Sequence, residues 1–101
     1  MVDKSTVITI IHNFIAELAN ADYSPDQVIL FGSYAKGNPH KFSDIDVAVW
    51  DRKFSGCLPI DFENIKSILS KYSSIEIHTF NSEDKDSPII EEIMANGIRI
   101  V

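Results

Sequence analysis

Hydrophobic positions recur with a helical period near the N-terminus of the chain. They follow the i, i+3, i+4, i+7 spacing of one helix face and comprise Val7, Ile10, Ile11, Phe14, Ile15 and Leu18. Ser5 or Thr6 is available as the N-cap of this predicted helix. Turn residues around Pro25 then separate the helix from the apolar run Val28 to Phe31, which is too short for a helix and indicates a buried strand.

Strict alternation marks two later segments as strands, because successive side chains of a strand point to opposite faces. Between Asp44 and Trp50, one face carries Ile45, Val47 and Val49, and the other carries Asp44, Asp46, Ala48 and Trp50. Between Ser74 and Phe80, one face carries Ile75, Ile77 and Thr79, and the other carries Glu76, His78 and Phe80. Each predicted strand therefore presents carboxylates on the face opposite its aliphatic residues.

Two further helices complete the predicted fold. Asp61 is the expected N-cap of the first, whose apolar stripe is Phe62, Ile65, Ile68, Leu69 and Tyr72. The second begins at Ser87 and Pro88, in the order of an N-cap followed by proline at the first helical position. Gly97 ends it, and Ile98 to Val101 forms a last short strand. Residues 1–101 thus predict a single α/β (α+β) domain, with helices packed on a small mixed sheet.

Composition narrows the classes of protein to consider. Of the 101 residues, 45% are hydrophobic and 24% charged, as in ordinary globular proteins. The formal net charge of −6 has the wrong sign for general nucleic-acid binding. Polar residues interrupt the N-terminal apolar stretch, so neither a membrane span nor a signal peptide is expected there. The single Cys57 cannot form an internal disulfide, which suits a reducing compartment and makes the cytoplasm the expected location.

Three polar features in the predicted strands indicate chemistry. Asp44 and Asp46 are separated by about 6.6–6.8 Å of strand rise, so both can approach one hard cation. Glu76 on another strand can complete a site for divalent metals, and two such metals roughly 3.5–4 Å apart can clamp a phosphoryl displacement. The turn Gly32–Ser33 allows close backbone approach to a polyphosphate and offers a hydroxyl and N–H groups to it.

The order of these features resembles the minimal nucleotidyltransferases of the polymerase-β superfamily. Positions 32–37 read GSYAKG, and positions 43–49, which begin six residues later, read SDIDVAV. Glu76 between two isoleucines resembles the third acidic residue of that family. The resemblance spans about residues 28 to 80, and the chain has the length of the minimal catalytic domain.

The resemblance implies a role for each matching residue. Gly32 and Ser33 would hold the terminal phosphates of ATP, with Lys36 and Gly37 shaping the loop. Asp44, Asp46 and Glu76 would be the catalytic residues and would bind two Mg²⁺ ions, a role that Mn²⁺ also suits. The family often has aspartate in place of Glu76 and arginine in place of Lys36. Lysine offers a single ammonium charge where arginine would offer the several fixed donors of a planar guanidinium.

The same resemblance implies a partner protein. Stand-alone members of this size are similar to the antitoxin of a type VII-like toxin–antitoxin module, in which AMP is transferred from ATP to a tyrosine hydroxyl of a HEPN-domain toxin. The expected activity is therefore that of a Mg²⁺-dependent protein adenylyltransferase. Two alternatives are a non-catalytic antitoxin that neutralises its partner by binding alone, and the catalytic subunit of a small-molecule adenylyltransferase.

Other polar and aromatic residues have simpler interpretations. His78 shares the face of Glu76 but is more typical of a surface or core histidine, so it is left outside the predicted site. His40 and Lys41 are expected in a solvated loop. Tyr34 and Trp50 can be assigned equally to stacking on a base and to packing.

Overall fold

The computed structural model describes residues 3–39 and 43–101 and contains helices and strands in alternation. The expectations for His40 and Lys41 lie outside the described residues. In chain order the elements are α1 (Lys4–Asn20), β1 (Gln27–Phe31), α2 (Gly32–Lys36), β2 (Ile45–Trp50), α3 (Leu58–Leu69), β3 (Ile75–Phe80), α4 (Pro88–Asn96) and β4 (Ile98–Arg99).

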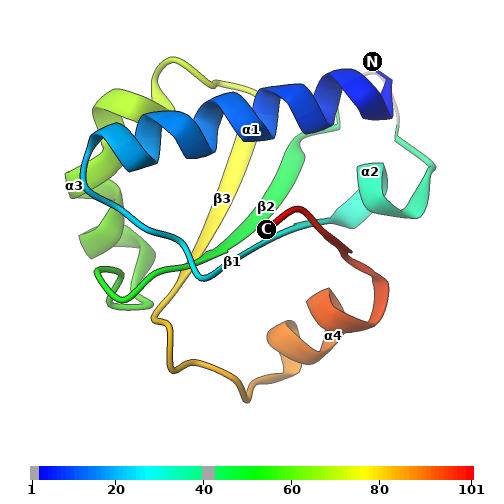
Figure 1. Ribbon diagram of the computed structural model, residues 1–101. Coiled ribbons are helices and arrows are strands. Elements are labelled where there is room, and N and C mark those ends of the chain that lie inside the picture. Colours follow the sequence, from blue (N-terminus) through cyan, green and yellow to red (C-terminus); the bar gives the residue numbers. More distant parts are fainter. Residues whose placement is uncertain (1–2, 40–42) are drawn as a thin grey trace.

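The strands form one mixed sheet in the order β3-β2-β1-β4 (Figure 1). β1 pairs antiparallel with both β2 and β4, whereas β2 and β3 run parallel through the crossover helix α3. Phe31 faces Asp46 across the β1–β2 pair, and Asp46 faces Glu76 across the β2–β3 pair. The predicted mixed sheet with packed helices is confirmed.

Helices cover the two faces of the sheet unequally, with α1 and α3 on one side and α4 on the other (Figure 1). The larger core joins α1 and α3 to the aliphatic faces of the strands and is built around Phe14, Leu30 and Val47. On the other face, Ile90 and Ile93 of α4 pack on Ile29, Ala48 and Trp50. Asp46 of β2 and Glu76 of β3 lie on this second face of the sheet, outside the apolar cluster that α4 covers.

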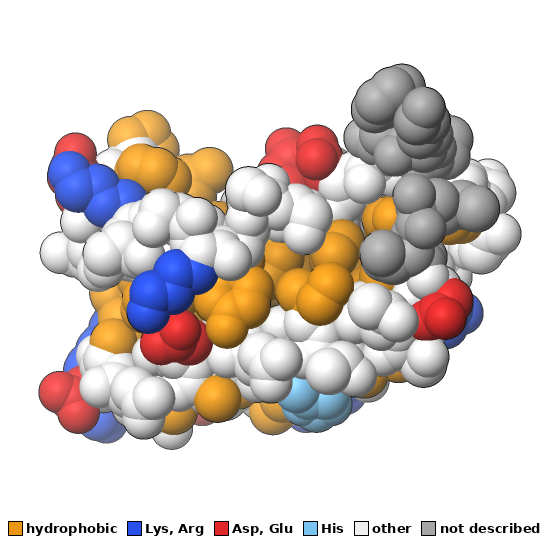
Figure 2. Space-filling model, turned by 90° about the horizontal axis from the view of Figure 1, so that it is seen from above, with side chains coloured by type: hydrophobic (Ala, Val, Ile, Leu, Met, Phe, Trp, Pro, Cys, Tyr) orange, Lys and Arg blue, Asp and Glu red, His pale blue; other side chains and the backbone are white. Residues whose placement is uncertain are grey.

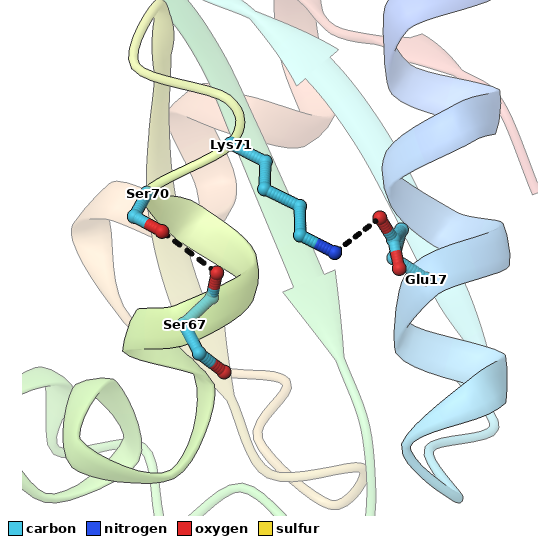
Figure 3. Close-up of polar contacts among 4 residues, drawn as sticks. All are labelled: Glu17, Ser67, Ser70 and Lys71. Carbon is cyan, nitrogen blue, oxygen red and sulfur yellow. Dashed lines mark hydrogen bonds and ion pairs between the residues drawn. The ribbon is translucent and has the colours of Figure 1, made fainter.

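The α1 side of the molecule combines apolar and ionic contacts. Hydrophobic side chains show in a band across this face, between polar and charged groups (Figure 2). Lys71 Nζ lies 3.2 Å from Glu17 Oε2 of α1, and Ser70 Oγ donates a 2.8 Å hydrogen bond to the carbonyl of Ser67 (Figure 3). An ion pair this exposed contributes little, so the apolar contacts hold α1 and α3 together. None of the described helices has the length and hydrophobicity to cross a membrane.

Helix boundaries differ from the expectations at two N-termini. Asp3, rather than Ser5 or Thr6, caps α1, and its carboxylate accepts the N–H of Thr6 at 2.8 Å. The helix α3 starts at Leu58, so Asp61 lies within its first turn. Ser87 and Gly97 flank α4 as predicted.

Asp61 is a buried hydrogen-bond centre instead of a cap. Its carboxylate accepts the N–H groups of Ser55 and Gly56 at 2.8 and 3.1 Å and the hydroxyl of Thr79 at 2.7 Å. The buried carboxylate therefore has hydrogen-bond partners, as it must in a residue that is only 2% exposed. These bonds tie the loop before α3 to β3.

The structure also corrects several predicted element bounds and burial assignments. The strands begin at Ile45 and Ile75, one residue after Asp44 and Ser74, and β4 ends at Arg99 instead of Val101. Phe62 does not belong to the buried stripe, because 44% of it is exposed, and Tyr72 lies beyond the end of α3. The short helix α2 was not predicted as a separate element. Tyr34 and Trp50 are buried, Trp50 stacking on Phe80 at 4.7 Å between ring centroids.

Candidate functional site

Two carboxylates and one imidazole converge where β2 and β3 lie side by side. Parallel register places Asp46 opposite Glu76, and His78 follows on the same face of β3. One ligand atom from each of these three side chains lies within 4.8 Å of the others. Asp46 and His78 are half-buried, whereas Glu76 is exposed. The site is thus open to solvent on the β3 side.

The ionisation of Asp46 is shifted by this arrangement. Burial raises the pKa of Asp46 from 3.8 to about 6, and the charge of Glu76, a hydrogen bond with Glu76 and the charge of Asp44 act in the same direction. Negative charges are therefore held together where solvent screens them incompletely. A divalent cation between them would reverse the sign of this effect and lower the pKa of Asp46.

Gly32 lies directly against Asp46. Its φ of +74° is in the left-handed region, and a Cβ built on it would lie 3.0 Å from Asp46 Cγ and still closer to Asp46 Oδ2. Glycine is therefore required here both by backbone conformation and by space. The close approach brings the turn between β1 and α2 next to the carboxylates.

The remaining residues of this turn lie close to Gly32 along one short helix. Ser33 is half-buried, and its carbonyl accepts the N–H groups of Gly37 and Asn38, which closes the turn. Lys36 and Gly37 are exposed, and Gly37 has a φ of +79° with nothing within 4 Å of a built Cβ. Of the four predicted phosphate-binding residues, Gly32 is the one that lies against Asp46, and Ser33, Lys36 and Gly37 follow it along α2 and its C-terminal cap.

Asp44, which was predicted to bind metal together with Asp46, lies in a different setting from Asp46. It precedes β2 and is exposed. Its charge still raises the pKa of Asp46, so the two side chains interact. Within the described residues, however, the cluster of metal-ligating atoms holds Asp46, Glu76 and His78 and does not include Asp44.

His78 is the residue that the sequence interpretation left outside the site. Its ring packs edge-on against Phe31 with 5.0 Å between centroids. Burial lowers the pKa of His78, and the charge of Glu76 opposes that shift. The shared face of Glu76 and His78 was visible in the alternation, but its significance depends on the parallel pairing with β2, which alternation does not reveal.

The donor set fits a divalent metal ion. Carboxylate oxygens are the ligands that Mg²⁺ and Mn²⁺ prefer, and a cation here would offset the burial and the repulsion from Glu76 that raise the pKa of Asp46. Asp46 and Glu76 are the residues that would hold the ion, and the exposed Asp44 lies outside their cluster of ligand atoms.

An apolar groove of about 370 Å³ borders the same site along the free edge of β3. Its lining comes from α3, the turn that follows it and β3, and includes Leu58, Phe62, Leu69, Tyr72 and Glu76. Leu58 and Phe62 are 40% and 44% exposed, which is unusual for large apolar side chains lining one hollow. Glu76 is therefore reached from the carboxylate cluster on one side and from an apolar surface on the other.

Comparisons with known proteins find a matching family model and solved structures of similar fold. Residues 13–101 match the family model described as polymerase beta, nucleotidyltransferase. A crystal structure of a toxin–antitoxin with AMP-PNP is similar with a TM-score of 0.62 at 21% identity, over 88% of this chain and 71% of the matched chain. An aspartate-to-glutamate double mutant of the toxin–antitoxin MntA-HpeT is similar with a TM-score of 0.58 at 16% identity, over 99% and 73%. No curated protein matches the sequence.

Proposed function

The chain belongs to the polymerase beta nucleotidyltransferase family, and we propose that it transfers AMP from ATP to a hydroxyl group of a partner protein with the help of Mg²⁺. The observation that carries this proposal is the convergence of Asp46 and Glu76 beside the Gly32–Ser33 turn. Carboxylates for a cation and a glycine turn for phosphates are the two halves of a nucleotidyl-transfer site. Here they meet at one end of β1 and β2.

Each side chain has a specific task in the proposed reaction. Ser33 and the backbone beside Gly32 donate hydrogen bonds to the terminal phosphates of ATP, while Lys36 and Gly37 complete the loop. Asp44, Asp46 and Glu76 would hold divalent metal ions, whose positive charge would offset the negative charge on the attacking and leaving oxygens. Glu76, at the solvent-open side, accepts the proton of the acceptor hydroxyl. A bond forms between that oxygen and the α-phosphorus, the bond to the β-phosphate breaks, and pyrophosphate leaves.

The acceptor in this proposal is a protein. The groove beside Glu76 is lined by exposed Leu58 and Phe62, a surface that suits apolar side chains of a polypeptide better than a small polar substrate. The similar solved structures are toxin–antitoxin structures, one of them with AMP-PNP. We therefore propose that the chain is the antitoxin of such a module, that its partner is a HEPN-domain toxin, and that the acceptor is a tyrosine of that toxin.

Mass spectrometry of the partner tests the proposal. The protein encoded beside this chain is co-expressed with it, purified, and measured intact and after proteolysis. We expect a mass increase of one or more adenylates on a tyrosine, and no increase with Asp46→Asn or Glu76→Gln. Asp86→Asn is the matched control, since Asp86 is an exposed loop carboxylate outside the site. An unmodified partner that is nevertheless inhibited in complex would reject adenylyl transfer and favour neutralisation by binding.

A further inference from the structure

His78 occupies a position from which it can reach the metal held by Asp46 and Glu76. The three ligating atoms lie within 4.8 Å of one another. A six-coordinate ion with bonds of about 2.1 Å places adjacent ligands about 3.0 Å apart and opposite ligands about 4.2 Å apart. The upper limit of 4.8 Å on these separations is close to the spacing of opposite ligands, so the three side chains are placed to share one ion.

The ring of His78 has no competing polar role in the described part of the chain. The ring packs edge-on against Phe31, an apolar contact that uses neither nitrogen. No hydrogen bond to either ring nitrogen occurs within residues 3–39 and 43–101. A half-buried imidazole beside two carboxylates thus keeps a lone pair available for coordination.

An imidazole ligand changes which metal the site prefers. Mg²⁺ favours oxygen donors and gains little from a nitrogen. Divalent transition metals bind imidazole well, and even Mn²⁺, the weakest of the series, accepts mixed carboxylate and imidazole sets. A site built from carboxylates alone would lack this preference for transition metals over Mg²⁺.

We propose that His78 is a metal ligand together with Asp46 and Glu76, and that this nitrogen makes the site prefer a transition metal such as Mn²⁺ over Mg²⁺. The inference rests on the metal site of the proposed function and deepens it, because it assigns a ligand and a metal class. It does not depend on the identity of the acceptor.

Titration calorimetry of the purified protein with Mn²⁺ and with Mg²⁺ tests the proposal. We expect the parent protein to bind Mn²⁺ more tightly than Mg²⁺. His78→Gln is expected to lower the affinity for Mn²⁺ at least about tenfold and to change the affinity for Mg²⁺ by less than about threefold. The matched control is His12→Gln, at an exposed position of α1. Unchanged Mg²⁺ binding also shows that the variant is folded.

Pulsed electron paramagnetic resonance of the Mn²⁺ complex gives an independent readout. Coupling to an imidazole ¹⁴N nucleus should be present in the parent protein and in His12→Gln, and absent in His78→Gln. If Mn²⁺ binds equally to parent and His78→Gln and shows no nitrogen coupling, the ligand assignment is wrong while the carboxylate site stands. Nitrogen coupling without any AMP transfer would instead leave the ligand assignment intact and reject the proposed function. Failure of both metals to bind the parent protein would overturn both.

Discussion

The carboxylate of Asp46 occupies the space that a side chain on Gly32 would need. A Cβ at position 32 would lie 3.0 Å from Asp46 Cγ and 3.3 Å from Asp46 Cβ. Phe31, the neighbour of Gly32, is the register partner of Asp46 across the β1–β2 pair. One close approach thus joins the glycine turn to the first carboxylate, and it explains why the two motifs must be read as one site.

Replacing Gly32 by alanine should therefore damage both stability and metal binding. Gly37→Ala is the matched control, since Gly37 also has a positive φ but open space around its Cα. The conformational cost of about 1–2 kcal/mol is common to both variants. We expect Gly32→Ala to lose at least about 1 kcal/mol more in denaturant unfolding and to bind divalent metal more weakly. Equal losses in the two variants would contradict the close approach.

The raised pKa of Asp46 predicts a pH dependence of the metal-free protein. A carboxyl group whose pKa is about 6 when folded and near 3.8 when unfolded stabilises the fold most at low pH. That contribution is lost as the pH rises through about 6, because the unfolded state then releases the proton more readily.

Asp46→Asn removes this titration, and the difference between parent and variant measures it. At about pH 7 and without metal, the variant should be more stable by roughly 1 kcal/mol, a figure reduced for solvent screening at a half-exposed site. At about pH 4 the gap should narrow. Thermal unfolding in chelator across this range is the measurement. A constant gap would show that Asp46 titrates normally.

The apolar groove beside Glu76 predicts a variant that separates acceptor binding from metal binding. Phe62→Ser removes a 44% exposed ring from the groove, and Ile89→Ser removes a similarly exposed aliphatic side chain from α4. We expect Phe62→Ser to lower AMP transfer at limiting acceptor by about tenfold, as for an interface anchor, with little change in Mn²⁺ affinity. Ile89→Ser should change neither. An equal effect of the two would place the acceptor elsewhere.

Replacing Asp61 should lower the free energy of unfolding, because this residue is a buried hydrogen-bond centre outside the candidate site. Its carboxylate accepts hydrogen bonds from Ser55, Gly56 and Thr79, so Asp61→Ala leaves these donors without their acceptor. Denaturant unfolding should show a loss of about 2–3 kcal/mol. Thr79→Val removes one donor only and should cost about 1 kcal/mol. A loss under about 0.5 kcal/mol for Asp61→Ala would mean that the loop is held by other contacts.

Most of the fold could be predicted from the sequence, because the hydrophobic periodicities that mark helices and strands are local. Alternation identified β2 and β3, and the order Ser87–Pro88 identified the start of α4. Asp61 was misassigned because a carboxylate near a helix start resembles a cap, and only its partners in the tertiary structure reveal the hydrogen-bond centre. His78 was left outside the site for the same reason, since its neighbour Asp46 lies on another strand. Phe62 has the spacing of a core residue, yet the groove along β3 leaves it exposed.

Transfer of label from ATP tests the central claim most directly. Purified chain and partner are incubated with a divalent metal and with ATP labelled at either the α- or the γ-phosphate, beside Asp46→Asn and the Asp86→Asn control. The account predicts label on the partner from α-labelled ATP alone, dependent on metal, lost in Asp46→Asn and kept in Asp86→Asn. Label that persists in Asp46→Asn, or that comes from the γ-phosphate, would contradict a nucleotidyl-transfer site built on Asp46.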